Sequence, residues 1–381
     1  MTNSCDTIVI GAGIAGCSAA WFLQERGVDV LLVDRSGFAA GGGSGAAGAF
    51  VSPKIGKGSI LQQLTNEAFE FAKDFYLERF SDYFSQTGVI RIPKDEEDAR
   101  KFILYEPFND SEYRWMDAES LHDLGIREEL KSFYFPEAGV CDAAKLCNAI
   151  YEKVPHRQFD VANLRREGDR WRVGQKEGDS ELSASRIVLA TGYQNSLFDM
   201  RYMGVRGTWG SRGDYYSDLD LKATMHKSIS ISARIDGVIK IGATHVKSEN
   251  PCMQCDGKPL AGLFAKASGL VDTSDFVLRE TYCGMRSGSK DYFPLLGRVI
   301  DVETMLANYP ALIRGAKAPL EYLEELYICN GLGGRGFVFA PLMAKMLADT
   351  IVDGREIDRR VDPDRLFLKW CRRSGEAAQK L

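Results

Sequence analysis

The sequence has few features that would assign the chain to a membrane-bound or nucleic-acid-binding class. No uninterrupted apolar run reaches the roughly 20 residues that a membrane-spanning helix needs. Lysine and arginine number 48 against 53 aspartates and glutamates, so the net charge is −5. A chain with this balance has no general positive field for nucleic acid or anionic lipid, although a local basic patch is compatible with it.

Metal-binding residues are also scarce. The four histidines are scattered, and Cys252-Met253-Gln254-Cys255 is the only C-x-x-C pair. A structural zinc site needs a second pair of ligands, and no pair is spaced for it. We therefore expect no metal, and an ordinary surface loop around this pair. The nine cysteines are more typical of reduced thiols than of a disulfide framework.

Chain length and the first residues complete this outline. A chain of 381 residues suffices for two or three domain-sized units with a large core. The first apolar run begins almost at Met1, which leaves no room for a signal peptide. We therefore expect a cytoplasmic protein that is not attached to a membrane.

The strongest positive signal lies in residues 6–34. Residues 7–10 and 28–33 are apolar, β-branched runs of the kind that form buried parallel strands. Between them lie the sequence Gly11-Ala12-Gly13-Ile14-Ala15-Gly16, which fills a G-x-G-x-x-G pattern, and a helical pattern that ends at Gly27. A lone pattern of this kind is a weak signal, but strand, turn, helix and second strand occur here in the order of one βαβ unit. The stretch therefore predicts a dinucleotide-binding site.

Each residue of the turn has a physical role in such a site. Gly11 permits the tight turn, Gly13 lets a pyrophosphate approach the backbone, and Gly16 lets the helix pack closely on the strand. The helix N-terminus, at Ile14 and Ala15, offers free N–H groups and the positive end of its dipole to the phosphates.

Asp34 and Arg35 close the second strand about 20 residues beyond the turn, where the ribose of adenosine is bound in such folds. An acid at this position argues against a 2′-phosphate and hence against NADP. The pattern alone does not separate NAD from FAD.

Residues 39–48 read AAGGGSGAAG, which is too rich in glycine for a helix or a strand. One interpretation is a flexible linker. The other is a second phosphate-facing loop in which Ser44 and Gly45 line the cofactor. Because the segment follows the ribose-binding acid so closely, we favour the second interpretation.

Two further segments are expected to reach the same site. Residues 185–192 form a buried strand that ends in Ala190-Thr191-Gly192, and small residues at a strand end let a ligand approach the carboxyl edge of the sheet. After another strand, Gly331, Gly333, Gly334 and Gly336 precede Phe337 and a long helix. A second helix N-terminus is therefore expected to point at the site, where it would stabilise negative charge such as that on a reduced flavin ring. A tight strand–helix turn is the simpler interpretation, but it does not need four glycines.

The middle of the chain has a different character. Residues 228–235 and 238–245 alternate in the manner of strands around Asp236-Gly237, which is the signature of an antiparallel hairpin. The sequence thus predicts an α/β protein with a Rossmann-like cofactor domain and an interleaved α+β substrate domain on an antiparallel or mixed sheet. We expect the discontinuous cofactor domain to comprise residues 1–80, 141–204 and 281–381, and the substrate domain to comprise 81–140 and 205–280.

Taken together, these segments resemble the D-amino-acid oxidase and glycine oxidase superfamily of FAD-dependent oxidoreductases. Within it, the chain is most similar to the FAD domain of the MnmC family of bifunctional tRNA-modification proteins. The superfamily likeness is carried by the N-terminal βαβ unit, the Ala190-Thr191-Gly192 strand end, and residues 284–297 and 331–337. The likeness to the MnmC family is carried by residues 43–45, 48–53, 66–69, 204–207, 290–294 and 333–336. Lys290 stands where that family has arginine, and Ser287 where it has cysteine.

The resemblance implies non-covalent FAD and oxidation of an amine. In that family the flavin domain removes the carboxymethyl group from carboxymethylaminomethyl-uridine at the wobble position of tRNA, which gives aminomethyl-uridine and glyoxylate. It also implies that a separate methyltransferase acts on the product, since the family joins this domain to one. Cys283 lies near the place where some sarcosine oxidases attach flavin through a thioether, but a buried free cysteine is the commoner explanation.

The substrate carboxylate calls for a cation that binds both of its oxygens, which guanidinium does better than ammonium. Arg286 is the first candidate by family position, followed by Arg206 and Arg335. The alternative for each is a structural salt bridge.

Two other functions remain open at this point: a small-molecule amine or amino-acid oxidase, and a flavin-binding scaffold without catalysis. A basic patch at the mouth of the substrate domain would favour tRNA, because phosphates must be neutralised there. The candidates for such a patch are Lys222, Lys227, Arg234, Lys240 and Lys247.

Overall fold

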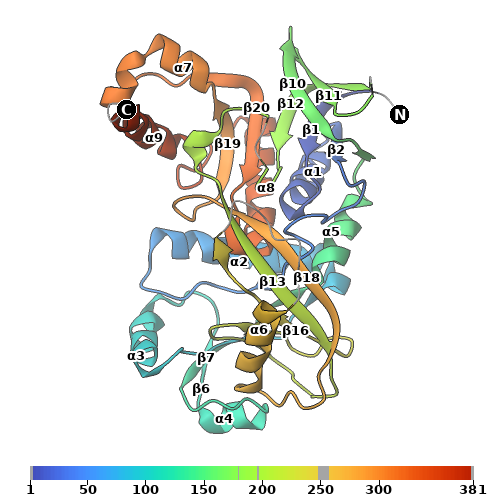
Figure 1. Ribbon diagram of the computed structural model, residues 1–381, viewed down its shortest axis with the longest axis vertical. Helices are drawn as coiled ribbons and strands as arrows, with labels where there is room; N and C mark the ends of the chain where they lie inside the picture. The colour runs from blue at the N-terminus through green and yellow to red at the C-terminus, as the bar shows by residue number, and fades with distance from the viewer. Residues whose placement is uncertain (1–2, 179, 195–196, 248–256, 379–381) are drawn as a thin grey trace.

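The computed structural model describes residues 3–178, 180–194, 197–247 and 257–378, so the Cys252–Cys255 pair lies outside the described residues. Its upper half in Figure 1 is built on an eight-stranded sheet with the order β10-β11-β12-β1-β2-β9, in which β20 pairs with β12 and β19 with β20. Strands β20, β12, β1, β2 and β9 run parallel, and Ile10 at the end of β1 lies beside Leu189 at the end of β12. The strands are β1 (Ser4–Ile10), β2 (Val30–Asp34), β9 (His156–Gln158), β10 (Val161–Glu167), β11 (Arg170–Gln175), β12 (Glu181–Leu189), β19 (Leu295–Ile300) and β20 (Tyr322–Asn330).

Both faces of this sheet are covered, which explains why its central strands are apolar throughout. Val9 points into a core that it shares with α1 (Ile14–Glu25), α2 (Ile60–Arg79), α5 (Ala143–Tyr151) and α8 (Gly336–Asp353). Ile8 and Ile10 alternate to the other face, where a second core packs against α7 (Val302–Asn308) and α9 (Asp364–Ala378). The predicted βαβ unit is therefore present, with both strands and the helix at the predicted places.

The lower half is built on a nine-stranded sheet with the order β17-β13-β16-β15-β14-β5-β7-β6, in which β18 also pairs with β13. Among the described strands of this sheet, only β14 and β5 pair in parallel, so the sheet is mixed, which is one of the two forms that the sequence predicts. The hairpin β15–β16 turns at Asp236 and Gly237, both at positive φ, although β15 is shorter than the alternating pattern suggests. The strands are β5 (Val89–Arg91), β6 (Arg114–Met116), β7 (Ser132–Phe135), β13 (Arg206–Tyr216), β14 (Thr224–His226), β15 (Ser230–Ile231), β16 (Val238–Gly242), β17 (Val246–Lys247) and β18 (Val277–Gly288).

One face of this sheet packs on α4 (Ala118–Asp123) and α6 (Lys258–Ser268) through a third core. The long strands β13 and β18 cross the middle of the molecule and join its two halves (Figure 1). The domain boundary predicted between residues 280 and 281 falls inside β18, which pairs along its whole length with β13. A small sheet of β3 (Phe50–Val51), β8 (Gly139–Cys141) and β4 (Phe84–Ser85) lies between, and α3 (Glu96–Tyr105) follows β5.

The cysteines depart from the expectation in one place. Cys5, Cys17, Cys141, Cys147, Cys329 and Cys371 are free thiols. Cys283 is disulfide-bonded, so the expectation of reduced thiols is wrong at this position. Its sulfur is therefore not available for a thioether to flavin.

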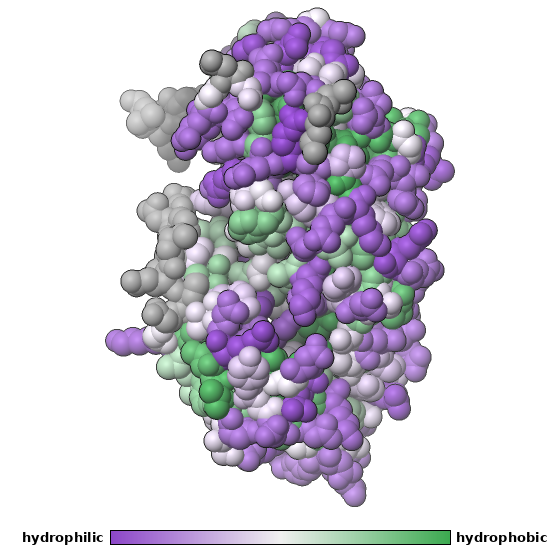
Figure 2. Space-filling view, turned by 90° about the vertical axis from the view of Figure 1, so that its right-hand side faces the viewer, coloured by the Kyte–Doolittle hydropathy of each residue, from purple (hydrophilic) through white to green (hydrophobic). Residues whose placement is uncertain are grey.

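Among the described residues, no helix is both long and apolar enough to cross a membrane. Figure 2 shows one face of the molecule, where hydrophilic residues predominate and hydrophobic residues form separate patches. Nor do three or more histidine, cysteine, aspartate or glutamate side chains of the described segments converge in a way that would hold a metal ion.

Candidate active site

The G-x-G-x-x-G turn is so tightly packed that its first and last glycines admit no side chain. Gly11 has φ 108°, and a Cβ there would lie 2.5 Å from the Ala190 carbonyl oxygen. A Cβ on Gly16 would lie 1.8 Å from the Gly11 carbonyl oxygen. The turn thus brings the start of α1 against the end of β12, which is the arrangement that the sequence predicts for Ala190 and Gly192.

Asp34 is tied to this turn and still has an accessible side. Its Oδ2 accepts a hydrogen bond from the Ala12 N–H at 2.8 Å, and its Oδ1 accepts one from the Ser36 N–H at 2.9 Å. The side chain is half-buried, and Arg35 beside it is exposed. The Ser36 hydroxyl also donates to Oδ1, at 2.5 Å. Because a carboxylate has about four acceptor positions, about one remains for a ribose hydroxyl group.

The glycine-rich segment 39–48 folds over the turn. The Ile14 N–H donates to Ser44 Oγ at 3.0 Å, the Ala40 N–H donates to the Ala12 carbonyl, and the Gly45 N–H donates to the Ala40 carbonyl. Arg212 Nη1 of β13 donates to the Ala47 carbonyl and holds the segment from below. These contacts favour the phosphate-facing loop over the flexible linker, because the Ser44 hydroxyl lies at the N–H groups that a pyrophosphate would use.

A buried asparagine, Asn330, connects the other predicted segments at the carboxyl edge of the sheet. Its side-chain N–H donates to the Gly192 carbonyl at 2.8 Å. Its Oδ1 accepts hydrogen bonds from Ser287 Oγ at 2.9 Å and from the Gly331 N–H at 2.7 Å. Asn330 could not be identified from the sequence, because a single polar residue at the end of an apolar strand forms no pattern.

The second helix N-terminus lies next to the first. Gly333 to Arg335 form a 3₁₀ turn, α8 starts at Gly336, and a Cβ on Gly336 would lie 3.3 Å from Ile14 Cγ2 of α1. The carbonyl of Phe337 accepts a hydrogen bond from the buried Tyr76 hydroxyl at 2.8 Å, which fixes the start of α8 on α2. Two helix N-termini, a half-buried acid and glycines where side chains would block access fit a dinucleotide with its pyrophosphate on α1. Gly11, Gly13, Ile14, Ala15, Gly16, Asp34, Arg35, Ser44, Gly45, Ala190, Gly192, Gly333, Gly334, Arg335, Gly336 and Phe337 stay the predicted cofactor contacts.

The three candidate arginines do not lie together. Arg286 Nη1 donates to the Thr244 carbonyl at 3.1 Å, and its guanidinium lies over Gly210, where a Cβ would come within 2.4 Å. A Cβ on Gly334 would lie 3.7 Å from Arg286 Cδ, so Arg286 adjoins the glycine turn and, next to it, Arg335. Arg206, in contrast, is exposed at the end of the β13–β18 ladder, opposite Gly288.

Arg286 and Arg335 also share an electrostatic property. Burial lowers the pKa of Arg286 and lowers that of Arg335 to about 10, because both guanidinium groups have lost water. Neither forms an ion pair within the described part of the chain. Their contacts are to backbone carbonyls, of Thr244 for Arg286 and of Ser52 for Arg335, so the structural salt bridge is not found for either.

Three side chains that the sequence analysis missed accompany Arg335: Lys54, Arg91 and His226. Burial and the charges of Arg335 and Arg91 lower the pKa of Lys54. Burial and the same two charges lower the pKa of His226 well below its usual value, so its ring is neutral at pH 7. Only the alternation of β5 could have pointed to Arg91, because Val89 and Arg91 share one face while Ile90 faces the third core.

The five residues considered for a basic patch do not form one. Lys227 pairs with Glu128 at 2.5 Å, Arg234 with Asp218 at 3.4 Å, and Lys222 with Asp220 at 3.5 Å. Lys240 is directed inward and donates to the Cys141 carbonyl. Of the five, Lys247 alone is exposed and unpaired within the residues described.

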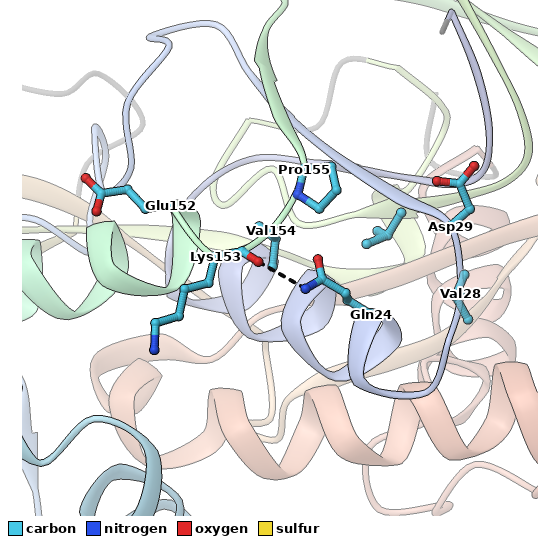
Figure 3. A pocket seen from close by; sticks show the side chains of 8 residues that line it. Gln24, Val28, Asp29, Glu152, Lys153, Val154 and Pro155 are labelled. Carbon is cyan, nitrogen blue, oxygen red and sulfur yellow. Dashed lines mark hydrogen bonds between the residues drawn. The ribbon is translucent and has the colours of Figure 1, made fainter. Parts of the chain in front are cut away.

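A surface hollow of about 540 Å³ lies at the opposite end of the cofactor domain (Figure 3). Gln24, Asp29 and Lys153 line it, and Gln24 donates to the Lys153 carbonyl at 3.0 Å. Asp29 precedes β2, whereas Asp34 ends it, so this hollow is distinct from the dinucleotide turn.

The fold and the site together define a dinucleotide-binding protein with a second sheet that contacts the glycine-rich loop through Arg212. Comparison with known families shows which cofactor this is. The chain belongs to the DAO family, described as FAD dependent oxidoreductase, whose pattern it matches over residues 6–350. It is therefore an FAD-dependent oxidoreductase, and the predicted family and cofactor are confirmed.

Curated relatives among those most similar in sequence to this chain share one name. The tRNA 5-methylaminomethyl-2-thiouridine biosynthesis bifunctional protein MnmC of Shewanella amazonensis is 25% identical over 96% of this chain and 60% of its own length. The protein of the same name from Methylobacillus flagellatus is 27% identical over 95% of this chain and 59% of its own length. The chain thus spans about three fifths of these relatives.

Solved structures with the same fold have other names. Glycine oxidase from Bacillus cereus superimposes with a TM-score of 0.78 at 20% identity, covering 95% of this chain and 98% of that one. Iminodiacetate oxidase from Chelativorans sp. BNC1 has a TM-score of 0.74 at 19% identity, covering 94% and 98%. At these identities the comparison establishes the fold.

Proposed function

We propose that this protein acts on a CH–NH group of tRNA. The reaction removes the carboxymethyl group from carboxymethylaminomethyl-uridine at the wobble position and yields aminomethyl-uridine and glyoxylate. The proposal draws on the similarity to the MnmC proteins along nearly the whole chain. The structural observation that carries it is the half-buried Arg286, which has no carboxylate partner among the described residues and adjoins the glycine turn at Gly334.

In this scheme the chain positions the substrate and the cofactor supplies the redox chemistry. When bound, FAD would supply the two-electron oxidation of the carbon beside the substrate nitrogen. Arg286 binds the substrate carboxylate through both oxygens and holds that carbon in place, which its contact with the Thr244 carbonyl supports by fixing the guanidinium. Water then hydrolyses the resulting imine. The aminomethyl product is a primary amine, which a separate methyltransferase would use.

A small-molecule amine or amino-acid oxidase is the second candidate. The observation that favours it is the pairing of Lys222, Lys227 and Arg234 with carboxylates, because a carboxylate beside each cation weakens its attraction for the tRNA backbone. Arg286 would serve the carboxylate of an amino acid equally well.

Mass spectrometry of nucleosides from tRNA distinguishes the two. A strain that lacks the gene should retain carboxymethylaminomethyl-uridine, and the wild-type gene should restore the downstream nucleoside. The Arg286→Ala variant, produced at the same level, should fail to restore it. Unchanged tRNA nucleosides in the deletion strain, together with flavin reduction by glycine or a D-amino acid, would contradict the tRNA function.

A further inference from the structure

A row of cross-strand neighbours runs over one face of the nine-stranded sheet. Residues directly opposite each other on paired strands carry their side chains on the same face. Arg212 in this row donates to the Ala47 carbonyl, so this face is turned toward the glycine-rich loop of the cofactor domain. In order across the sheet, the row consists of Arg212, Gly242, Ser230, His226 and Arg91.

At the Arg91 end of this row, three cations lie close enough for their charges to act on one another, and none of them forms an ion pair within the described residues. Arg335 comes from the glycine turn and donates to the Ser52 carbonyl at 3.1 Å, and Lys54 lies two residues further along the same segment. Across the described residues, the side chains of Arg91 and Lys54 have no hydrogen-bond or ion-pair partner. The charge of Asp98 acts on Arg91, but the Asp98 carboxylate accepts its hydrogen bond from the Lys94 N–H.

Without a bound anion, this group of charges lowers the stability of the folded protein. Burial and the charge of Arg335 lower the pKa of Arg91 to about 9, and Lys54 is affected in the same direction. The polar neighbour of Arg91 on this face is His226, whose Nδ1 lies 2.6 Å from Ser230 Oγ and whose ring is neutral. Like charges without a partner in a poorly solvated place destabilise the fold, and an anion bound between them removes that cost.

The position of the group relative to Arg286 makes it a second anion site. Arg286 approaches the glycine turn at Gly334, and Arg335 is the next residue. Arg286 is directed to the Thr244 carbonyl, whereas Arg335 is directed to Ser52 on the opposite segment. The two guanidinium groups therefore serve two different positions within one site. A substrate amine with a single carboxylate would contact only Arg286.

We propose that Lys54, Arg91 and Arg335 form a subsite that binds a phosphate group attached to the nucleoside whose amine is oxidised. The inference rests on the proposed function and specifies the substrate as a nucleotide. Guanidinium groups match phosphate oxygens in geometry, and a lysine adds a point charge. Such a subsite would attract the phosphates of a nucleic acid locally, although the net charge of the chain is −5.

Flavin reduction by two small substrates tests the subsite. The probes are carboxymethylaminomethyl-uridine and its 3′,5′-bisphosphate, mixed anaerobically with the FAD-loaded enzyme. For the wild type, we expect kcat/KM to be about 10-fold or more higher for the bisphosphate, as for a charge-assisted contact. Lys54→Gln and Arg91→Gln should each reduce this ratio to about 2-fold or less, mainly through KM, while kcat with the nucleoside stays unchanged.

Arg100→Gln is the matched control. Arg100 is exposed on α3 and loses the same charge in the same substitution, so the ratio should stay at the wild-type value. Thermal unfolding provides a second readout. Without phosphate, Arg91→Gln should unfold at the wild-type temperature or above it, because the variant no longer contains the unpaired cation.

The outcomes separate the subsite from the proposed function. Equal kcat/KM for the two probes in the wild type, or an unchanged ratio in Arg91→Gln, would overturn the subsite and leave the tRNA reaction intact. Loss of FAD from Arg91→Gln would assign the cations to the cofactor and overturn it as well. If neither probe reduces the flavin but glycine does, the proposed function fails and the phosphate subsite fails with it.

Discussion

Removal of the Asp214 carboxylate should cause a large loss of stability, because this carboxylate acts on two largely buried cations. Arg212 and Asp214 are both almost fully buried, and their side chains form two hydrogen bonds of 2.8 and 3.2 Å. The Arg212 guanidinium also lies 4.1 Å from the centre of the Tyr282 ring. Asp214 raises the pKa of the neighbouring Lys240, which burial and Arg212 lower. The carboxylate thus compensates two cations.

The Asp214→Ala variant leaves both cations uncompensated. Breaking a buried pair in this way costs about 3–5 kcal/mol, and we expect a decrease of that size in the free energy of unfolding. The assay is urea denaturation of the apoprotein. The double variant Arg212→Met/Asp214→Leu should recover most of this loss, because replacing both charges by apolar groups is nearly neutral.

FAD affinity should respond differently from stability. Arg212 donates to the Ala47 carbonyl in the loop that carries Ser44, and the double variant lacks this donor. We expect its FAD dissociation constant to increase by about 5- to 10-fold, the equivalent of one hydrogen bond. A decrease in the stability of Asp214→Ala of less than about 1 kcal/mol would refute the reasoning, because it would mean that the pair is well solvated.

Three further predictions concern Asp34, Cys283 and Asp364. Asp34→Ala should weaken FAD retention by roughly 1–3 kcal/mol, measured by flavin release on dialysis, because the ribose loses its acceptor; a colourless protein that binds NAD would contradict the cofactor site. Acid precipitation should leave the yellow colour in the supernatant, because Cys283 is disulfide-bonded; colour in the pellet would indicate covalent flavin. Burial raises the pKa of Asp364 from 3.8 to about 6, so the stability that Asp364 contributes should decrease as pH rises from about 4 to 6. The Asp364→Asn variant should lack this decrease, and its stability should equal that of the wild type at pH 4. The same dependence of stability on pH in both proteins would contradict the raised pKa of Asp364.

Much of the fold could be predicted because its signals are local. The strand, turn and helix around Gly11 and Gly16 follow one another directly, and the turn at Asp236-Gly237 marks its own hairpin. The glycine-rich segment could be interpreted as a loop over the cofactor because it follows Asp34, and its contacts with Ile14 and Ala12 agree with that interpretation.

The parts that escaped prediction depend on residues far apart in the sequence. The pairing of β5 with β14 places Arg91 opposite His226, and the sequence does not reveal this pairing. Asn330 joins Gly192 and Ser287, whose proximity no periodicity reveals. The lysines of the substrate domain suggested a basic patch, but the tertiary fold pairs some of them with carboxylates such as Glu128, which the sequence does not reveal.

The central claim is that Arg286 holds the substrate carboxylate while FAD is reduced. Rapid-mixing absorbance under anaerobic conditions measures this step directly with tRNA that carries carboxymethylaminomethyl-uridine. Arg286→Ala should lower the rate of flavin reduction on the order of 10²-fold or more with FAD still bound, because positioning is lost. Arg286→Lys should recover it only in part, since the charge remains but the second contact does not. With methylaminomethyl-uridine tRNA, which lacks the carboxylate, the wild type and Arg286→Ala should barely differ. Unchanged reduction of Arg286→Ala by the carboxymethylaminomethyl substrate would contradict the account.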